Sequence, residues 1–169
     1  MHCLTRLSLL AALGLALAGC SSAPVGFTLS GEPGFYKKLT ATSAKVDSVA
    51  ARDMISIYRT NHGLSALSVD SALQKAAEEQ VLAMARADNM SHEIAGTLRV
   101  RLDGRLDHST AVENISAGYH TLAEAFSGWR DSPGHNKNML NPAMRRMGIA
   151  TAYVPESKYK VYWALILTD

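Results

Sequence analysis

The chain has 169 residues, of which 47% are hydrophobic and 19% are charged, the composition of one globular domain with an additional segment. Its 17 basic and 15 acidic side chains give a formal charge of +2, with no concentrated basic face. This balance excludes a dedicated nucleic-acid-binding protein, because phosphate binding needs such a face, and the apolar content excludes disorder over most of the length.

Residues 1–19 have the pattern of an export signal. Arg6 supplies the positive charge, residues 7–17 form an apolar run, and small residues follow. The apolar run is shorter than the ~20 residues that a membrane-spanning helix requires. We therefore predict that residues 1–19 are removed from the mature protein.

The end of this signal, Leu-Ala-Gly-Cys at residues 17–20, resembles the lipobox of bacterial lipoproteins, in which the cysteine is acylated and becomes the N-terminus. We predict that Cys20 is lipidated and anchors the protein to a membrane, with a plain secreted protein as the alternative. Cys3 lies inside the signal, so the mature domain has no cysteine left for a disulfide. Ser21 stands where an aspartate would favour inner-membrane retention, which favours the outer membrane of a bacterial envelope.

Residues 20–45 are predicted to form a flexible tether. They are rich in serine, glycine, proline and threonine and show no sustained apolar period. A segment of this composition is typical of the link between a lipid anchor and a folded domain. We place that domain at residues 46–169.

Two helices are predicted at the start of the domain. Apolar residues recur at spacings of three and four from Asp47, and the sequence Asn-His-Gly at residues 61–63 ends this first helix. Ser71 and Gln74 then have the spacing of a capping box, which opens a second helix. The apolar side of that second helix continues to about Asp88.

The middle of the domain is harder to interpret. Residues 98–103 alternate between apolar and charged side chains, which favours a short strand, with a short helix as the alternative. Thr121 and Glu124 again have the spacing of a capping box, so we assign Glu124 to a helix cap rather than to a site. The helix that follows is expected to end at Pro133-Gly134.

Two strands are predicted near the end of the chain, over residues 147–154 and 160–167, joined by a hairpin loop. The second strand is almost continuously apolar after Lys160. Such a strand should be buried on both faces, which helices on either side of a small sheet would achieve.

The densest polar chemistry lies between Glu113 and His135, with His92 upstream. Two imidazoles and a carboxylate are ligands that zinc accepts, but sequence separation carries no geometric information, and the residues alone favour a structural role for each histidine. Ser132 lies near His135, and we interpret its hydroxyl as part of a helix stop rather than as a nucleophile. Asn114 is expected to support its neighbours by bonding backbone groups.

Several motifs in a fixed order carry a family resemblance: Tyr58-Arg59, Ser91-His92, Glu113-Asn114-Ile115, Ala117-Gly118-Tyr119, Trp129, Ser132-Pro133-Gly134-His135, Asn141-Pro142 and Met147-Gly148-Ile149. Over residues 46–168 the chain resembles a bacterial member of the CAP superfamily, which includes cysteine-rich secretory proteins, wasp-venom antigen 5 and plant pathogenesis-related proteins. The resemblance implies an α+β fold, a three-layer α-β-α sandwich with a small central and mainly antiparallel sheet.

The resemblance also implies a cleft that can hold a divalent metal such as zinc. By its motifs, His92, Glu113 and His135 match two histidines and one acidic residue of the family tetrad. Ser132 occupies the position where the eukaryotic pattern has a glutamate, so one carboxylate is missing. We expect this loss to weaken metal binding.

We therefore rank binding above catalysis. The leading interpretation is an exported, lipid-anchored protein, expected to be monomeric, that binds a lipid or other small hydrophobic ligand, or a partner in the envelope or host. The alternative is a divalent-metal-dependent hydrolase that uses His92, Glu113 and His135. A purely structural envelope module is the third interpretation.

Overall fold

The computed structural model describes residues 31–41 and 45–169. The predicted signal, Cys20 and much of the predicted tether lie outside the described residues. The helices and strands of the described part are α1 Ser48–Thr60, β1 Ser68–Val69, α2 Ser71–Ala87, α3 Leu98–Leu102, β2 Ala111–Ala117, α4 Leu122–Asp131, α5 Pro133–Met139, β3 Arg146–Tyr153 and β4 Val161–Thr168.

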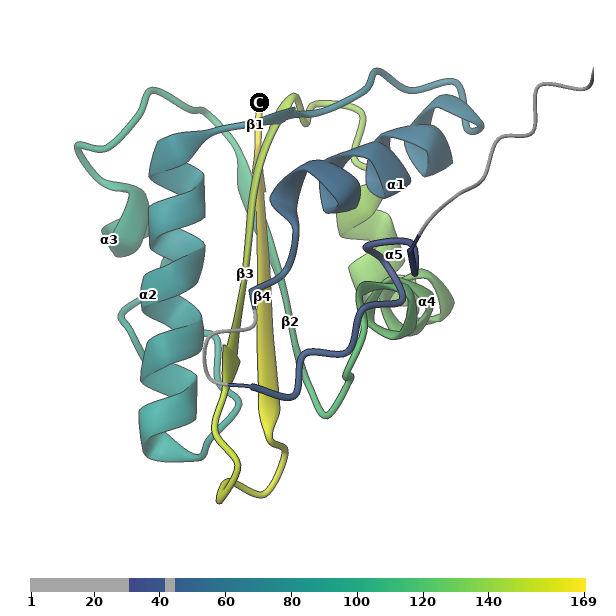
Figure 1. The fold of residues 1–169 in the computed structure, drawn as a ribbon. Helices are drawn as coiled ribbons and strands as arrows, with labels where there is room; N and C mark the ends of the chain where they lie inside the picture. Colours follow the sequence, from purple (N-terminus) through teal and green to yellow (C-terminus); the bar gives the residue numbers. More distant parts are fainter. Residues whose placement is uncertain (1–30, 42–44) are drawn as a thin grey trace, which may run out of the picture. The chain divides into compact units, whose positions relative to one another are not determined.

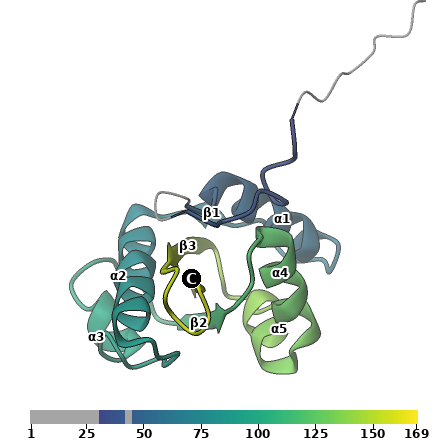
Figure 2. The same ribbon diagram turned by 60° about the horizontal axis from the view of Figure 1, so that its bottom comes forward.

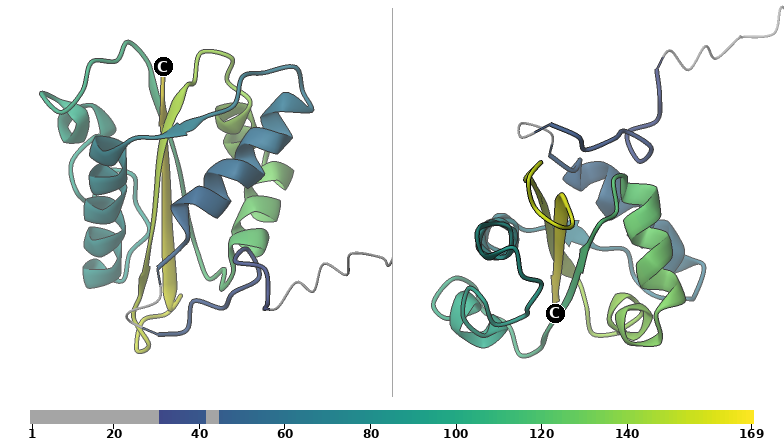
Figure 3. Two further views of the ribbon diagram at one scale, coloured as in Figure 1. Left: turned by 45° about the horizontal axis from the view of Figure 1, so that its top comes forward. Right: turned by 90° about the horizontal axis from the view of Figure 1, so that it is seen from below.

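The strands form one sheet in the order β1-β3-β4-β2. β1 is parallel to β3, whereas β4 runs antiparallel to both of its neighbours. Helices α2 and α3 cover one face, and α1, α4 and α5 cover the other (Figures 1 and 2). This is the predicted three-layer sandwich, and the view from below in Figure 3 separates its layers. All eight residues of β4 are buried between the layers, as predicted.

The first two helices form where the sequence predicts them, but the cap of α2 differs. The carboxylate of Asp47 accepts hydrogen bonds from the first turn of α1, and Asp70 does the same for α2. The predicted capping box at Ser71 and Gln74 is therefore wrong, because the preceding aspartate takes that role. Gln74 instead exchanges two hydrogen bonds with the backbone of Ile149, at 2.7 and 3.2 Å, and so joins α2 to β3.

Helix α3 is the short helix that we considered as the alternative over residues 98–103, and the strand interpretation is wrong. Leu98 and Leu102 lie one turn apart and pack into the core beneath α2, while Val100 is 68% exposed. The alternation of apolar and charged residues thus reflects one apolar helix face with an additional exposed valine.

The capping box at Thr121 and Glu124 is confirmed at the start of α4. The predicted stop at Pro133-Gly134 is correct only for α4, which ends at Asp131. Pro133 immediately begins α5, a helix that the sequence patterns do not predict. Proline is well suited to the first position of a helix, because the N–H that it lacks would have no partner within the helix.

Strand β2 is also absent from the sequence-based prediction. It carries Glu113, Asn114 and Ser116, polar residues that weaken the apolar pattern, yet all three are buried. β2 is an edge strand of the sheet, so polar side chains on both of its faces can meet the loop before α3 and the helix α5.

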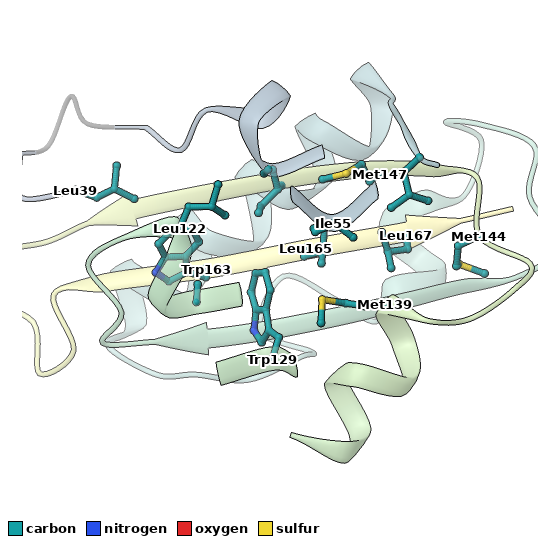
Figure 4. Packing of buried hydrophobic residues seen from close by; sticks show 14 of the residues in the cluster. Leu39, Ile55, Leu122, Trp129, Met139, Met144, Met147, Trp163, Leu165 and Leu167 are labelled. Carbon is teal, nitrogen blue, oxygen red and sulfur yellow. The ribbon is translucent and has the colours of Figure 1, made fainter. Parts of the chain in front are cut away.

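Each face of the sheet has its own hydrophobic core. Beneath α1 and α4, the rings of Trp129 and Trp163 meet edge-to-face with centroids 6.3 Å apart (Figure 4). The core beneath α2 includes small residues such as Ala77. There, β3 approaches α2 so closely that a Cβ on Gly148 would lie 2.2 Å from the carbonyl carbon of Leu73, which requires glycine.

A buried cation connects α1 to the end of α5. Arg59 is 0% exposed, and burial lowers the pKa of its guanidinium, followed by repulsion from Arg145. The guanidinium donates to backbone carbonyls at 2.6–3.0 Å, those of Ser65, Met139, Asn141 and Met144. It therefore holds together segments distant in the sequence.

Candidate functional site

The predicted site residues come from three different segments around the edge strand β2. His92 lies in the loop between α2 and α3, Glu113 lies in β2, and His135 lies in α5. The structure brings His92 and Glu113 into contact, with 2.8 Å between Nδ1 and Oε2. Because a carboxylate oxygen accepts, Nδ1 donates and the Nε2 atom of His92 is left for other partners.

A residue that the sequence reasoning missed completes this contact. Arg101 of α3 donates from Nη2 to Oε1 of Glu113 at 2.7 Å, and both side chains are 3% exposed. The same guanidinium donates to the carbonyl oxygens of Gly96 and His92, which fixes the loop that carries the histidine. Both oxygens of Glu113 are therefore engaged, one by an arginine and one by an imidazole.

His135 reaches the same edge of the sheet through backbone contacts. The side-chain amide of Asn114 donates to the carbonyl of His135 at 3.0 Å. Asn138 in turn donates to Oδ1 of Asn114 at 2.9 Å and to the carbonyl of Glu113 at 3.2 Å. Asn114 thus bonds a backbone group, as expected, and it belongs to a polar network that holds α5 against β2.

The surroundings of His135 favour its uncharged state. Burial lowers the pKa of His135 below its ordinary value, and electrostatic repulsion from the nearby His92 lowers it further. His135 therefore favours its neutral form. The pocket at this edge of the sheet is lined by His92, Glu113 and Asn138 among others, and His135 lies in the same helix as Asn138.

These residues do not fit a metal ion held by three protein ligands. Among residues 31–41 and 45–169, no three histidine, cysteine, aspartate or glutamate side chains converge to hold one. Glu113 already faces the guanidinium of Arg101, and an ion bound to the same carboxylate would lie close to that positive charge. Ser132, at the fourth family position, supplies no carboxylate. Metal binding in this cleft stays a prediction.

A separate apolar groove lies between α1 and α4, with a volume of about 580 Å³. Its apolar lining consists of Phe35, Ala50, Met54, Ile57, Tyr58 and Phe126. The ring of Tyr58 meets that of Phe126 edge-to-face at 5.4 Å, and its hydroxyl donates to Asn136 of α5 at 2.9 Å. Tyr58 thereby links the groove to the helix that carries His135.

The sequence reasoning did not find this groove. Its wall joins a short segment before α1, one side of α1 and a single ring from α4. The spacing of Ala50, Met54 and Tyr58 at every fourth residue was the available signal, but core packing produces the same spacing.

Comparison with known proteins identifies the family. The sequence model of the Cysteine-rich secretory protein family (CAP) matches residues 52–167, which is more than half of the chain. The chain belongs to the CAP family. This CAP-family chain is 28% identical over 130 residues to the uncharacterized protein YkwD of Bacillus subtilis, and 32% identical over 117 residues to the uncharacterized membrane protein YlbC of the same organism.

Solved structures agree with this assignment. An extracellular protein containing an SCP domain from Bacillus anthracis is 28% identical to the CAP domain, with a TM-score of 0.61 over 70% of this chain and 38% of that one. An outer surface protein of Borrelia burgdorferi shares the fold at 18% identity, with a TM-score of 0.63 over 75% of this chain and 97% of that one.

The matched relatives are longer than this chain. The match to YkwD covers 72% of this chain but 51% of YkwD, and the match to YlbC covers 68% of this chain but 33% of YlbC. Within residues 31–41 and 45–169, each helix is too short or too polar to span a membrane.

Proposed function

We propose that this CAP-domain protein binds a small apolar molecule, such as an acyl chain, in the groove between α1 and α4. The groove itself carries the proposal. Its volume of about 580 Å³ lies within the range of about 300–1,000 Å³ that is usual for small-molecule sites. Its lining is mostly aliphatic and aromatic, with Asp53 and Asn61 as the polar exceptions.

The polar cleft supports ligand binding less well. Both carboxylate oxygens of Glu113 already accept hydrogen bonds, one from Arg101 and one from His92. A hydrolase that used Glu113 itself as the general base would first have to break this buried pair, whereas one that used Nε2 of His92 would not. Binding in the groove requires no such rearrangement.

Replacing Ala50 by phenylalanine should abolish ligand binding by filling the groove. Ala50 lines the groove from α1, and the added ring would occupy the space of an apolar ligand. We expect the affinity for a dansyl-labelled fatty acid to fall at least tenfold, which is about 1.4 kcal/mol. Fluorescence titration of the purified full chain measures this change.

The matched control is Leu82→Phe, an exposed position on α2, across the sheet from α1. It should leave the affinity unchanged. The binding proposal would be refuted by a folded Ala50→Phe variant with native affinity, or by a wild-type chain that binds no fatty-acid probe.

We also propose that the protein is exported and anchored to the envelope through a lipid on Cys20. The apolar run, the Leu-Ala-Gly-Cys sequence at residues 17–20 and the absence of any other cysteine after the signal support this proposal. Structural relatives described as extracellular or outer-surface proteins are consistent with export.

The Cys20→Ser variant tests the anchor. We expect the wild-type chain to incorporate labelled palmitate and to fractionate with membranes, and the variant to incorporate no label because it lacks the acceptor thiol. Cys3→Ser serves as the control and should behave like the wild type. If the Cys20→Ser variant still incorporates palmitate, Cys20 is not the lipidation site.

A further inference from the structure

The groove lies beside the segment through which the N-terminal part of the chain joins the domain. Phe35 lines the groove, and its carbonyl accepts a hydrogen bond from the N–H of Ala123 in α4 at 2.9 Å. A few residues later, the N–H of Leu39 donates to the carbonyl of His120 at 2.8 Å. The segment is therefore fixed against the start of α4, beside α1 (Figure 1).

Large apolar side chains are exposed on this same side of the domain. Tyr36 is 53% exposed, with its ring centroid 4.6 Å from that of Phe35. On α1, Val49 is 53% and Ile57 is 62% exposed, and Ile57 also lines the groove. Leaving such side chains in water is unfavourable, so their presence on the two segments that line most of an apolar groove indicates a surface that contacts something apolar.

The charges beside this surface are consistent with a lipid headgroup layer. Exposed Lys37 and Lys38 directly follow Tyr36, and tyrosine and lysine together are typical of segments at the membrane interface. The acidic groups of α1 are already engaged: Asp47 caps the helix, and Asp53 pairs with Arg52 at 2.5 Å.

The length of chain before the domain restricts where this surface can lie. Gly31 lies 11 residue steps after Cys20. Fully extended, they span at most about 40 Å, at about 3.6 Å per residue. A domain held this close to its anchor stays near the membrane, and Gly34 and Phe35, which follow this stretch in the sequence, line the groove.

We propose that the face around the groove docks on a phospholipid bilayer. Tyr36, Val49 and Ile57 enter the headgroup region, and Lys37 and Lys38 contact lipid phosphates. The groove then opens toward the bilayer, which would supply its acyl-chain ligand. This inference rests on the proposed function: the lipid on Cys20 keeps the domain near the bilayer, and the groove receives its acyl-chain ligand from that bilayer.

Depth-dependent quenching of a fluorescent probe tests the docking. The full lipidated chain carrying Ile57→Cys is labelled with the dye NBD and reconstituted into vesicles of phosphatidylcholine and phosphatidylglycerol that contain nitroxide-labelled lipid. Leu82→Cys on α2, 47% exposed, is the matched control on the opposite layer. We expect at least twofold stronger quenching at position 57 than at position 82. Equal quenching at the two positions would overturn the proposal.

A second variant separates docking from simple proximity to the anchor. Adding Tyr36→Glu and Val49→Glu to the labelled Ile57→Cys chain should reduce its quenching to that of the Leu82 control. Both positions are exposed, so the fold should persist, and circular dichroism checks that it does. Unchanged quenching in this folded variant would show that the anchor alone places the probe, and docking would be refuted.

The outcomes also distinguish docking from ligand binding. Strong quenching at position 57 with no fatty-acid binding would refute the groove ligand but retain the docked face. Fatty-acid binding with equal quenching at positions 57 and 82 would refute docking alone. If mass spectrometry finds Cys20 unmodified, the same pair of probes is compared in a Cys20→Ser chain added to vesicles from solution, where stronger quenching at position 57 supports docking and equal quenching overturns it.

Discussion

Replacing Arg59 by methionine should destabilise the CAP domain by about 3–5 kcal/mol. The guanidinium donates to carbonyls of Met139 and Met144 in fully buried contacts, at 2.6 and 3.0 Å, as well as to two others. Each buried carbonyl left without a donor costs about 1–3 kcal/mol. Urea unfolding followed by the fluorescence of the buried tryptophans measures the change.

Arg52→Met is the control for Arg59→Met, because it removes an arginine from the same helix. Arg52 is partly exposed and pairs with the adjacent Asp53, so its loss should cost less than about 1 kcal/mol. Equal stability of the two variants would contradict the role assigned to Arg59.

The second large effect is expected for Glu113→Gln. This change removes the charge that pairs with the buried guanidinium of Arg101. A buried charge left without its partner typically destabilises a protein by about 3–5 kcal/mol. Urea unfolding of the variant should show a loss in this range, and the adjacent loop with His92 should exchange its amide hydrogens faster.

Glu79→Gln provides the matched control, because Glu79 pairs with Arg105 at 2.7 Å on the surface, where such pairs contribute less than about 1 kcal/mol. Adding Arg101→Met to Glu113→Gln should restore part of the lost stability, since the guanidinium left without its carboxylate would then be gone as well. A Glu113→Gln variant as stable as Glu79→Gln would contradict the buried pair.

Periodicity predicted the elements that bury one continuous apolar face. Helices α1, α2 and α4 and strands β3 and β4 all have apolar residues at regular spacing, and each lies where the sequence places it. The elements that were missed depend on polar residues. Strand β2 buries Glu113 and Asn114, and α5 begins with Pro133, a residue more often associated with a stop.

The polar cleft and the apolar groove were predicted less completely, because contacts between residues that are distant in the sequence leave no local sequence pattern. The family motifs selected Glu113 and His92, which do meet, but nothing near Glu113 indicated that Arg101 of α3 would neutralise it. The groove was likewise hidden, since Phe35, Met54 and Phe126 become neighbours only after folding.

Photo-crosslinking locates the ligand most directly. The full chain is irradiated with a diazirine-bearing fatty acid, and the modified peptides are identified by mass spectrometry. We predict saturable crosslinks to residues 33–36, to residues 50–61 and to Phe126, and their loss in Ala50→Phe. Saturable crosslinks at His92 and His135 instead, or none that unlabelled fatty acid competes away, would contradict an apolar binding site between α1 and α4.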